Sequence, residues 1–433
     1  MDIITVLMLA LAALILLGLP IYMVLIASTL VALLTLGDLP LAVIHNSLFE
    51  GLNSFPLLAI PCFVVAGTLM EQGGVTGQII GVVKQLVGRV HGGLGITTIL
   101  ACTFFAAISG SGPGTVAAVG TLLIPSMLKN GYTPRYAASV SSSGGTVGIL
   151  IPPSNPLIIY GIMGNISLTG LFTAGFVPGF LIAAALMLTT WLVARRHGFS
   201  GDASQPPFEA RAFLRACRRN AFSLLTPFII LGSIYSGVCT PVEASVISVA
   251  WALFVGGVVN RSLSFSGIYE ALLEGVMLCG VVLLIVGAST LFGKLLTFEQ
   301  VPARLAAAFL AVSESRTVIL LLILGLLLIL GMFLETLATL IILVPVLLPV
   351  ALQLGVDPIH FGIILVVTNE IALLTPPLGI NLFVASRIAG IPVESVAAGV
   401  VPYIGTLILC MLLITFVPEI STWLPHALGY GVR

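Results

Sequence analysis

The fold is decided by two segments of the sequence, SSSGGTVGILIPPSNP at residues 141–156 and TNEIALLTPPLGIN at residues 368–381. Each lies in a largely apolar stretch and contains two adjacent prolines. Because proline lacks a backbone N–H and its ring clashes with the preceding helical turn, such a pair ends a helix. We therefore expect a helix that is broken partway along in each of the two segments.

The amino-acid composition indicates a membrane protein. The chain has 433 residues, of which 59% are hydrophobic and 7% are charged. A soluble domain of this composition would lack the polar groups to cover its surface. Apolar runs such as 3–36, 242–259 and 317–333 approach or exceed the roughly 20 residues that a bilayer-spanning helix needs. The sequence predicts an all-α, multi-pass protein of the bacterial inner membrane.

Charge and motifs exclude several classes of function. The net charge is zero, so the chain has no electrostatic footprint for nucleic acid. The six cysteines lack C-x-x-C spacing and the five histidines include no H-E-x-x-H pair, so a metal centre has no support. Phosphate-binding loops of the Walker A and G-x-G-x-x-G types are absent as well. We expect no enzyme activity, and any pumping must draw on an ion gradient.

Both broken segments belong to an internal repeat. Sliding the chain against itself by 224 residues (339 minus 115) aligns 115–178 with 339–402 without a gap. Of the six prolines in the first window, five land on prolines, and Thr115 lands on Thr339. The five pairs are Pro125/Pro349, Pro134/Pro358, Pro152/Pro376, Pro153/Pro377 and Pro178/Pro402. The chain therefore contains two copies of one unit.

The positive charges indicate that the two copies are inverted. The loop at 129–135 carries two cations, whereas its repeat partner at 353–360 has no Lys or Arg. The stretch 195–219 holds six arginines against Asp202 and Glu209, so we expect it on the cytoplasmic side. Equivalent loops on opposite faces of the membrane give the inverted topology that many secondary transporters use.

The first copy also contains a hairpin of apolar segments that are too short to cross a bilayer. The apolar segments 94–108 and 115–128 have 15 and 14 residues. At 1.5 Å per residue they reach about 21–22 Å of a roughly 30 Å hydrocarbon core. Between them lies SGSGPG at 109–114, and the counterpart in the second copy is GMFLET at 331–336. We expect two re-entrant hairpins whose tips meet in the middle of the membrane.

The tips and the breaks are the candidate binding elements. Freed carbonyls and hydroxyls are hard oxygen ligands that suit Na⁺, and half-helix N-termini favour a carboxylate. Glu335 and Glu370 are candidate functional acids, because a carboxylate within the membrane is costly. The alternatives are close packing through Gly and Ser, simple proline kinks, and a buried Glu that is hydrogen-bonded only for structure.

Few cations remain in the apolar spans to pair with an anionic substrate. Hydroxyl, amide and backbone groups at the tips and breaks are therefore expected to bind it. The candidate substrate contacts are Ser111, Ser154, Asn155, Glu335, Thr336, Asn369, Pro376 and Asn381.

At these residues the chain resembles the large membrane subunit of the tripartite ATP-independent periplasmic (TRAP) transporters of the C4-dicarboxylate/sialic acid type. The resemblance rests on ISGS at 108–111, GGTVGILIPPS at 144–154, GVDPIHFG at 355–362 and LLTPPLGINLF at 373–383. Length and repeat layout agree along essentially the whole chain. The resemblance implies a Na⁺-driven secondary transporter of the ion-transporter superfamily, which imports a small organic acid by an elevator motion.

The resemblance also implies ion sites and partners. The Na⁺-site residues carried over by position are Ser109, Gly148, Ile151 and Pro153 for one ion, and Gly331, Ala372 and Thr375 for the other. A periplasmic binding protein would deliver the substrate, and a small four-helix membrane subunit would brace the scaffold. Fused relatives carry that subunit at their N-terminus, so we expect it here as a separate chain.

The expected organisation has five parts. These are N-terminal scaffold helices at 1–55, a first inverted repeat at 56–194, a basic cytoplasmic linker at 195–220, further scaffold helices at 221–275 and a second inverted repeat at 276–433. Two other interpretations are a stand-alone ion-coupled carrier of the same superfamily and an intramembrane enzyme, for which the His and Cys positions supply no nucleophile–base pair. Sialic acids, C4-dicarboxylates and other sugar or keto acids share a carboxylate, so the sequence does not select among them.

Overall fold

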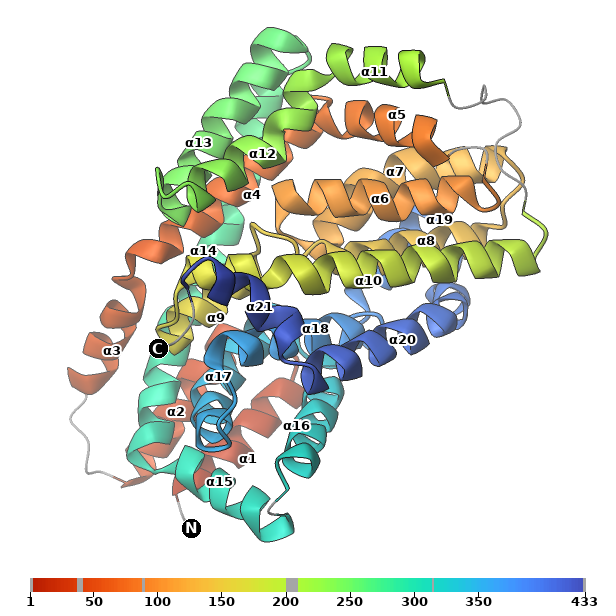
Figure 1. Ribbon diagram of the computed structural model, residues 1–433. Coiled ribbons are helices and arrows are strands. Elements are labelled where there is room, and N and C mark those ends of the chain that lie inside the picture. Colours follow the sequence, from red (N-terminus) through yellow and green to blue (C-terminus); the bar gives the residue numbers. More distant parts are fainter. Residues whose placement is uncertain (1–2, 37–41, 88–89, 200–208, 314, 431–433) are drawn as a thin grey trace.

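The computed structural model describes residues 3–36, 42–87, 90–199, 209–313 and 315–430, and throughout these ranges its regular structure is helical (Figure 1). The helices of the first half are α1 (Ile3–Leu16), α2 (Ile21–Leu36), α3 (Ala42–Leu52), η1 (Phe55–Leu58), α4 (Ala59–Gln72), α5 (Val75–Val87), α6 (Gly93–Ser109), α7 (Gly112–Lys129), α8 (Pro134–Val147), α9 (Asn155–Gly164), α10 (Leu168–Arg196) and α11 (Ala210–Arg219). Those of the second half are α12 (Ala221–Tyr235), α13 (Pro241–Leu253), η2 (Phe254–Val259), α14 (Phe265–Phe298), α15 (Val301–Val312), α16 (Arg316–Gly331), α17 (Thr336–Gln353), α18 (Pro358–Ala372), α19 (Ile380–Ala389), α20 (Val393–Phe416) and α21 (Glu419–Ala427).

The helix boundaries reproduce the internal repeat. Adding 224 to both ends of α7 gives the two ends of α17, and the same shift takes the first residue of α8 to that of α18. Each hairpin packs against the helix that follows the break of the other copy, since α7 contacts α19 and α17 contacts α9. The predicted fold, two inverted repeats that each contain a helical hairpin and a helix broken at a proline pair, is confirmed.

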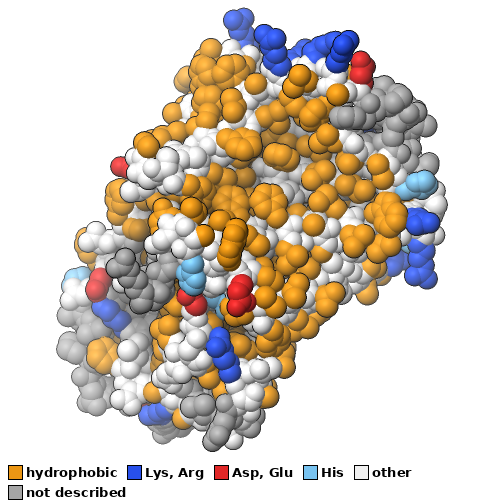
Figure 2. Space-filling view, viewed as in Figure 1, with side chains coloured by type: hydrophobic (Ala, Val, Ile, Leu, Met, Phe, Trp, Pro, Cys, Tyr) orange, Lys and Arg blue, Asp and Glu red, His pale blue; other side chains and the backbone are white. Residues whose placement is uncertain are grey.

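The surface is that of a membrane protein. Six helices in the described ranges are long and apolar enough to cross a bilayer, among them α10, α14 and α20. Large hydrophobic side chains such as Phe228, Met277 and Leu409 are exposed. Figure 2 shows hydrophobic side chains across the middle of one face, with charged side chains gathered toward its ends. The prediction of a multi-pass membrane protein is confirmed.

Two apolar runs differ in detail from single spanning helices. The run at 3–36 is divided at Gly18, which has a φ of 72°, and α1 packs against α2. Pro20 follows, so the chain turns where the sequence places a glycine and a proline. The run at 242–259 continues α13 into the π-helical turn η2.

The break of the first copy begins later than its Ser/Gly-rich sequence suggests. The residues from Ser141 to Val147 remain helical in α8, and the irregular backbone runs from Gly148 to Ser154. Serine and glycine weaken a helix by less than about 1 kcal/mol each, so buried packing maintains α8 up to the turn that precedes Pro152. In the second copy the irregular segment runs from Leu373 to Gly379.

The five-part organisation remains a prediction. The boundary proposed between residues 275 and 276 falls inside α14, which is one continuous helix of 34 residues. Residues 200–208 of the predicted linker, including Asp202, lie outside the described ranges.

Candidate functional site

The first hairpin reverses direction within two residues. Helix α6 ends at Ser109, and Gly110 follows in the left-handed conformation with a φ of 60°. Ser111 then caps α7, its hydroxyl accepting a hydrogen bond from the backbone N–H of Gly114. A side-chain carbon at Gly110 would lie 2.6 Å from the carbonyl oxygen of Pro153, so only glycine lets the tip approach the break so closely.

The first tip and the first break form a small oxygen-lined cradle. The hydroxyls of Ser109 and Thr115 lie 2.9 Å apart, and the Thr115 hydroxyl also donates to the Ser111 carbonyl at 2.8 Å. A side-chain carbon at Gly148 would lie 2.7 Å from Thr115 Oγ1 and 2.8 Å from the carbonyl oxygen of Gly145. Because Gly148 has no side chain, the Thr115 hydroxyl and the Gly145 carbonyl face the same small space.

A backbone hydrogen bond attaches the break to the tip in each copy. In the first copy the Asn155 N–H donates to the Gly110 carbonyl at 3.4 Å, and in the second the Leu378 N–H donates to the Met332 carbonyl at 3.1 Å. The peptide bonds Pro152–Pro153 and Pro376–Pro377 are both cis. The two half-sites are thus built in the same way.

The second tip and the second break form a matching cradle around Gly331. A side-chain carbon at this position would lie 2.7 Å from Cβ of Ala372 and 2.8 Å from Oδ1 of Asn369. The Asn369 side chain is 1% exposed, and its Oδ1 has no hydrogen-bond partner among the described residues. The third predicted member, Thr375, donates its hydroxyl to the Ile371 carbonyl at 3.2 Å.

Glu370 lies between the two tips. It is 1% exposed, and its Oε1 accepts a hydrogen bond from the Thr336 hydroxyl of the second tip at 3.1 Å. Its Oε2 has no partner within the described part of the chain, and a side-chain carbon at Gly112 of the first tip would lie 3.4 Å from it. Half of a buried carboxylate is therefore left without a donor.

Asn381 belongs to the second copy but lies against residues of the first half-site. Its side chain is fully buried, and both polar atoms of the amide lack a partner among the residues that the structure describes. A side-chain carbon at Gly145 would lie 3.2 Å from its Nδ2, and the Ser142 hydroxyl donates to its backbone carbonyl at 3.3 Å. Orphaned polar groups at this depth are the property expected of a site that binds an ion or a polar ligand.

Other predicted residues are placed differently. Ser111 and Ser154 are helix caps, because each hydroxyl accepts a backbone N–H three residues later. Asn155 is buried with Oδ1 unpaired, whereas Glu335 and Pro376 are exposed. The side chain of Ile151 packs against Gly179 in α10.

The structure places three residues at the centre of the candidate site that were not predicted from the sequence, namely Thr115, Gly145 and Gly112. A signal for the first existed, since Thr115 aligns with Thr339 in the internal repeat. Both threonines donate to the carbonyl of the residue four positions earlier, at 2.8 and 3.0 Å. The two glycines act only through the space that they leave, which no local sequence pattern reveals.

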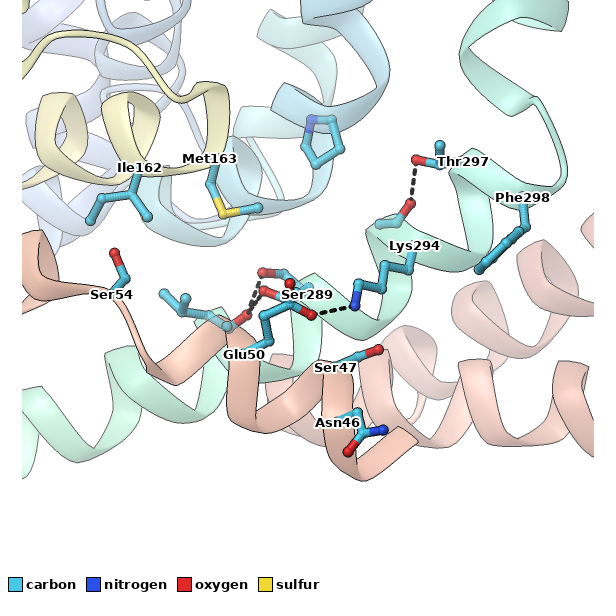
Figure 3. A pocket seen from close by; sticks show the side chains of 15 residues that line it. Asn46, Ser47, Glu50, Ser54, Ile162, Met163, Ser289, Lys294, Thr297 and Phe298 are labelled. Carbon is cyan, nitrogen blue, oxygen red and sulfur yellow. Dashed lines mark hydrogen bonds and ion pairs between the residues drawn. The ribbon is translucent and has the colours of Figure 1, made fainter. Parts of the chain in front are cut away.

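A separate cavity of about 730 Å³ lies between α3 and α14 on one side and α9 and α17 on the other. Figure 3 shows Glu50 of α3 and Lys294 of α14 pointing toward each other, with Ile162 and Met163 of α9 across the space. The Glu50–Lys294 ion pair measures 2.5 Å, and its side chains are 68% and 38% exposed. The cavity is lined by polar and apolar side chains of all four helices.

Comparison with known proteins gives a consistent result. Residues 8–420 match the family model described as "Tripartite ATP-independent periplasmic transporter, DctM component". The C4-dicarboxylate TRAP transporter large permease protein DctM of Pseudomonas aeruginosa is 40% identical over 382 residues, 88% of this chain and 89% of that protein. The sialic acid TRAP transporter large permease protein SiaM of Vibrio cholerae is 39% identical over 415 residues, 96% of each chain.

Two further relatives extend the comparison. The isethionate TRAP transporter permease protein DctMQ of Oleidesulfovibrio alaskensis is 39% identical over 403 residues, which are 93% of this chain but 63% of that longer protein. Among solved structures, the YdaH transporter of Alcanivorax borkumensis has a TM-score of 0.65 at 16% identity, with 90% of this chain and 89% of that chain covered. At this identity the likeness concerns the fold.

Proposed function

The chain belongs to the tripartite ATP-independent periplasmic transporter family as a DctM component, and on that premise we propose that it imports a small organic acid anion together with Na⁺ by elevator-type alternating access. The observation that carries the proposal is the pair of equivalent cradles at Gly148 and Gly331, each formed where a hairpin tip meets a broken helix. Such breaks are where secondary transporters bind ions and substrate.

The residues at each cradle fit a hard monovalent cation. In the first, the hydroxyls of Ser109 and Thr115 and the carbonyl of Gly145 would hold one Na⁺, with backbone groups of Gly148, Ile151 and Pro153 close by in the chain. In the second, Gly331, Asn369, Ala372 and Thr375 would hold another. Hydroxyl and carbonyl oxygens of this kind suit Na⁺, even though the residues of the first site carry no formal negative charge.

The names of the relatives support an organic acid anion as the substrate. Relatives of this chain are named for isethionate, C4-dicarboxylate and sialic acid, which are all organic acid anions. We propose that the substrate binds near Asn369, Glu370 and Asn381, where Oδ1 of Asn369, Oε2 of Glu370 and both amide atoms of Asn381 have no partner among the described residues. A bound Na⁺ beside each cradle would offset the repulsion between Glu370 and an anionic substrate.

The transport cycle needs partners and a moving part. We propose that a periplasmic binding protein delivers the substrate, and that a small membrane subunit braces α3, α4, α13 and α14. The repeats would then move as one body along these helices, across the cavity that Glu50 and Met163 line. Spin labels on Met163 and Thr297 would change their separation during the cycle, whereas labels within α9 and α17 would keep theirs.

The proposal is tested by uptake into proteoliposomes. The chain and its small membrane subunit are reconstituted, a panel of radiolabelled organic acids is offered with the binding protein, and Na⁺ is replaced by K⁺ in the control. We expect accumulation only with an inward Na⁺ gradient and only with the binding protein present. Uptake that is indifferent to the cation contradicts the coupling, and Na⁺-driven uptake without the binding protein identifies a stand-alone carrier.

A further inference from the structure

Helix α11 presents a strongly basic face that the transport site does not use. It carries four arginines in ten residues, namely Arg211, Arg215, Arg218 and Arg219. At about 100° of rotation per residue, these side chains fall within an arc of roughly 100° around the helix. In Figure 1 the helix lies at one extremity of the molecule, and Figure 2 shows Lys and Arg side chains gathered at that end.

Burial divides α11 into an inner and an outer face. The inner side chains are half-buried where α11 contacts α5, and they are Ala212, Phe213, Ala216 and Cys217. All four arginines are exposed, and beside them Leu214 is 69% exposed. The outer face therefore consists of four positive charges and one large apolar side chain.

The arginines have no acidic partner within the described ranges of this chain. The ion pairs found there involve Lys294 with Glu50 and His426 with Asp357, which belong to other helices. Glu209 precedes α11 and is exposed without capping it. Four exposed cations without an acidic partner among the described residues create a positive potential on this face, which attracts anions.

The neighbouring helix places this face at the surface of the bilayer. A single residue, Asn220, separates α11 from α12, whose side chains Phe222, Leu225 and Phe228 are 44%, 45% and 66% exposed. Because such side chains face lipid, the arginines are held at the depth of the lipid headgroups. A short helix with basic residues and an exposed leucine is typical of a segment that lies in the membrane interface.

We propose that the outer face of α11 binds anionic phospholipid headgroups of the leaflet that the basic residues assign to the cytoplasmic side. The guanidinium groups of the four arginines would contact phosphate oxygens, and Leu214 would enter the acyl boundary. The favoured partner is lipid rather than RNA or an acidic protein, because the face adjoins a lipid-facing helix and includes an apolar side chain.

Lipid selectivity can be measured on the intact protein. The full chain is reconstituted in bilayers that contain spin-labelled phosphatidylglycerol or phosphatidylcholine, and the fraction of motionally restricted lipid of each type is determined by electron paramagnetic resonance. The test variant replaces all four arginines with Gln. We expect the preference for phosphatidylglycerol to fall by about threefold or more, since each interfacial cation contributes to the attraction.

Three control variants keep the test specific. Replacing Lys129, Arg135, Arg195 and Arg196 with Gln removes the same number of positive charges from outside α11 and should change the preference much less. Replacing the α11 arginines with Lys should retain most of it, and Leu214→Gln should lower it slightly. An unchanged preference in the four-Gln variant would overturn the proposal and would indicate that this face binds a soluble acidic partner instead. An equal loss of preference in the charge-matched control would also overturn it.

Discussion

The two half-sites are built from equivalent elements, yet one is covered and the other is open. Ser109 of the first tip is 8% exposed, whereas Phe333 of the second tip is 59% exposed. Residues 144–155 are all buried, whereas Pro376 and Pro377 of the second break are exposed. The same pattern of prolines thus yields two environments.

Neighbouring helices explain the difference. Helix α4 closes on the first tip at Gly67, where a side-chain carbon would lie 3.2 Å from Cα of Ser109. The offset of 224 residues takes Gly67 to Leu291 of α14 (67 plus 224), so a leucine stands where the first copy has the glycine. The repeats therefore define where a helix breaks, whereas contacts from outside the hairpin, such as that of Gly67 with Ser109, cover the first tip.

The largest effect is expected from a methyl group in the first cradle. In Gly148→Ala the new carbon would lie 2.7 and 2.8 Å from two oxygens, whereas the equivalent residue of the second copy is already Ala372. Overpacking of about 1–3 kcal/mol corresponds to a loss of roughly 5- to 150-fold in coupled binding. We expect Na⁺-driven uptake to fall toward the upper end of this range, as measured in proteoliposomes.

The matched control for that variant is Gly405→Ala in α20, where the added carbon would have no neighbour within 4 Å. It should leave uptake unchanged. Ala372→Gly introduces into the second copy the glycine that the first copy has at the equivalent position. This variant should change Na⁺ activation only slightly. If Gly148→Ala transported normally while remaining folded, the first cradle would not be an ion site.

The second prediction concerns access to the two tips. In a variant without the six native cysteines, a thiol at position 333 should react with a hydrophilic maleimide at least about tenfold faster than one at position 109, because thiol reactivity depends on exposure. The measurement compares labelling rates of Phe333→Cys and Ser109→Cys by mass spectrometry. Similar rates in the absence of Na⁺ and substrate would mean that the two half-sites are equally open.

The third prediction uses the paired threonines. Thr115 contacts both Ser109 and Ser111, whereas the hydroxyl of Thr339 has Glu335 as its single hydrogen-bond partner among the described residues. Removing a hydroxyl ligand costs about 1 kcal/mol, so Thr115→Val should raise the Na⁺ concentration for half-maximal uptake by roughly fivefold. Thr339→Val should raise it by less than about twofold. The reverse order would assign the ion to the second tip instead.

The tips and breaks were predictable from the sequence because proline and glycine act locally. The paired prolines gave the repeat offset, and the tip at 109–114 lies between α6 and α7 as expected. The contacts across the two copies were not predictable in this way. Glu370 meets Gly112, and Asn381 meets Gly145, only because residues more than 200 positions apart pack together. The cover over the first tip depends on Gly67, which lies outside both motifs.

The smallest effect is expected for the Glu50–Lys294 ion pair, which joins α3 to α14. A half-exposed pair contributes about 0–1 kcal/mol, so Glu50→Gln should lower the melting temperature of the purified protein by no more than about 2–4 °C and leave uptake within about twofold. The double variant Glu50→Gln/Lys294→Met, which removes both charges, should be as stable as the single one or more so. A loss of uptake that the double variant fails to restore would show instead that these two charged side chains are needed for transport and do more than stabilise the contact between α3 and α14.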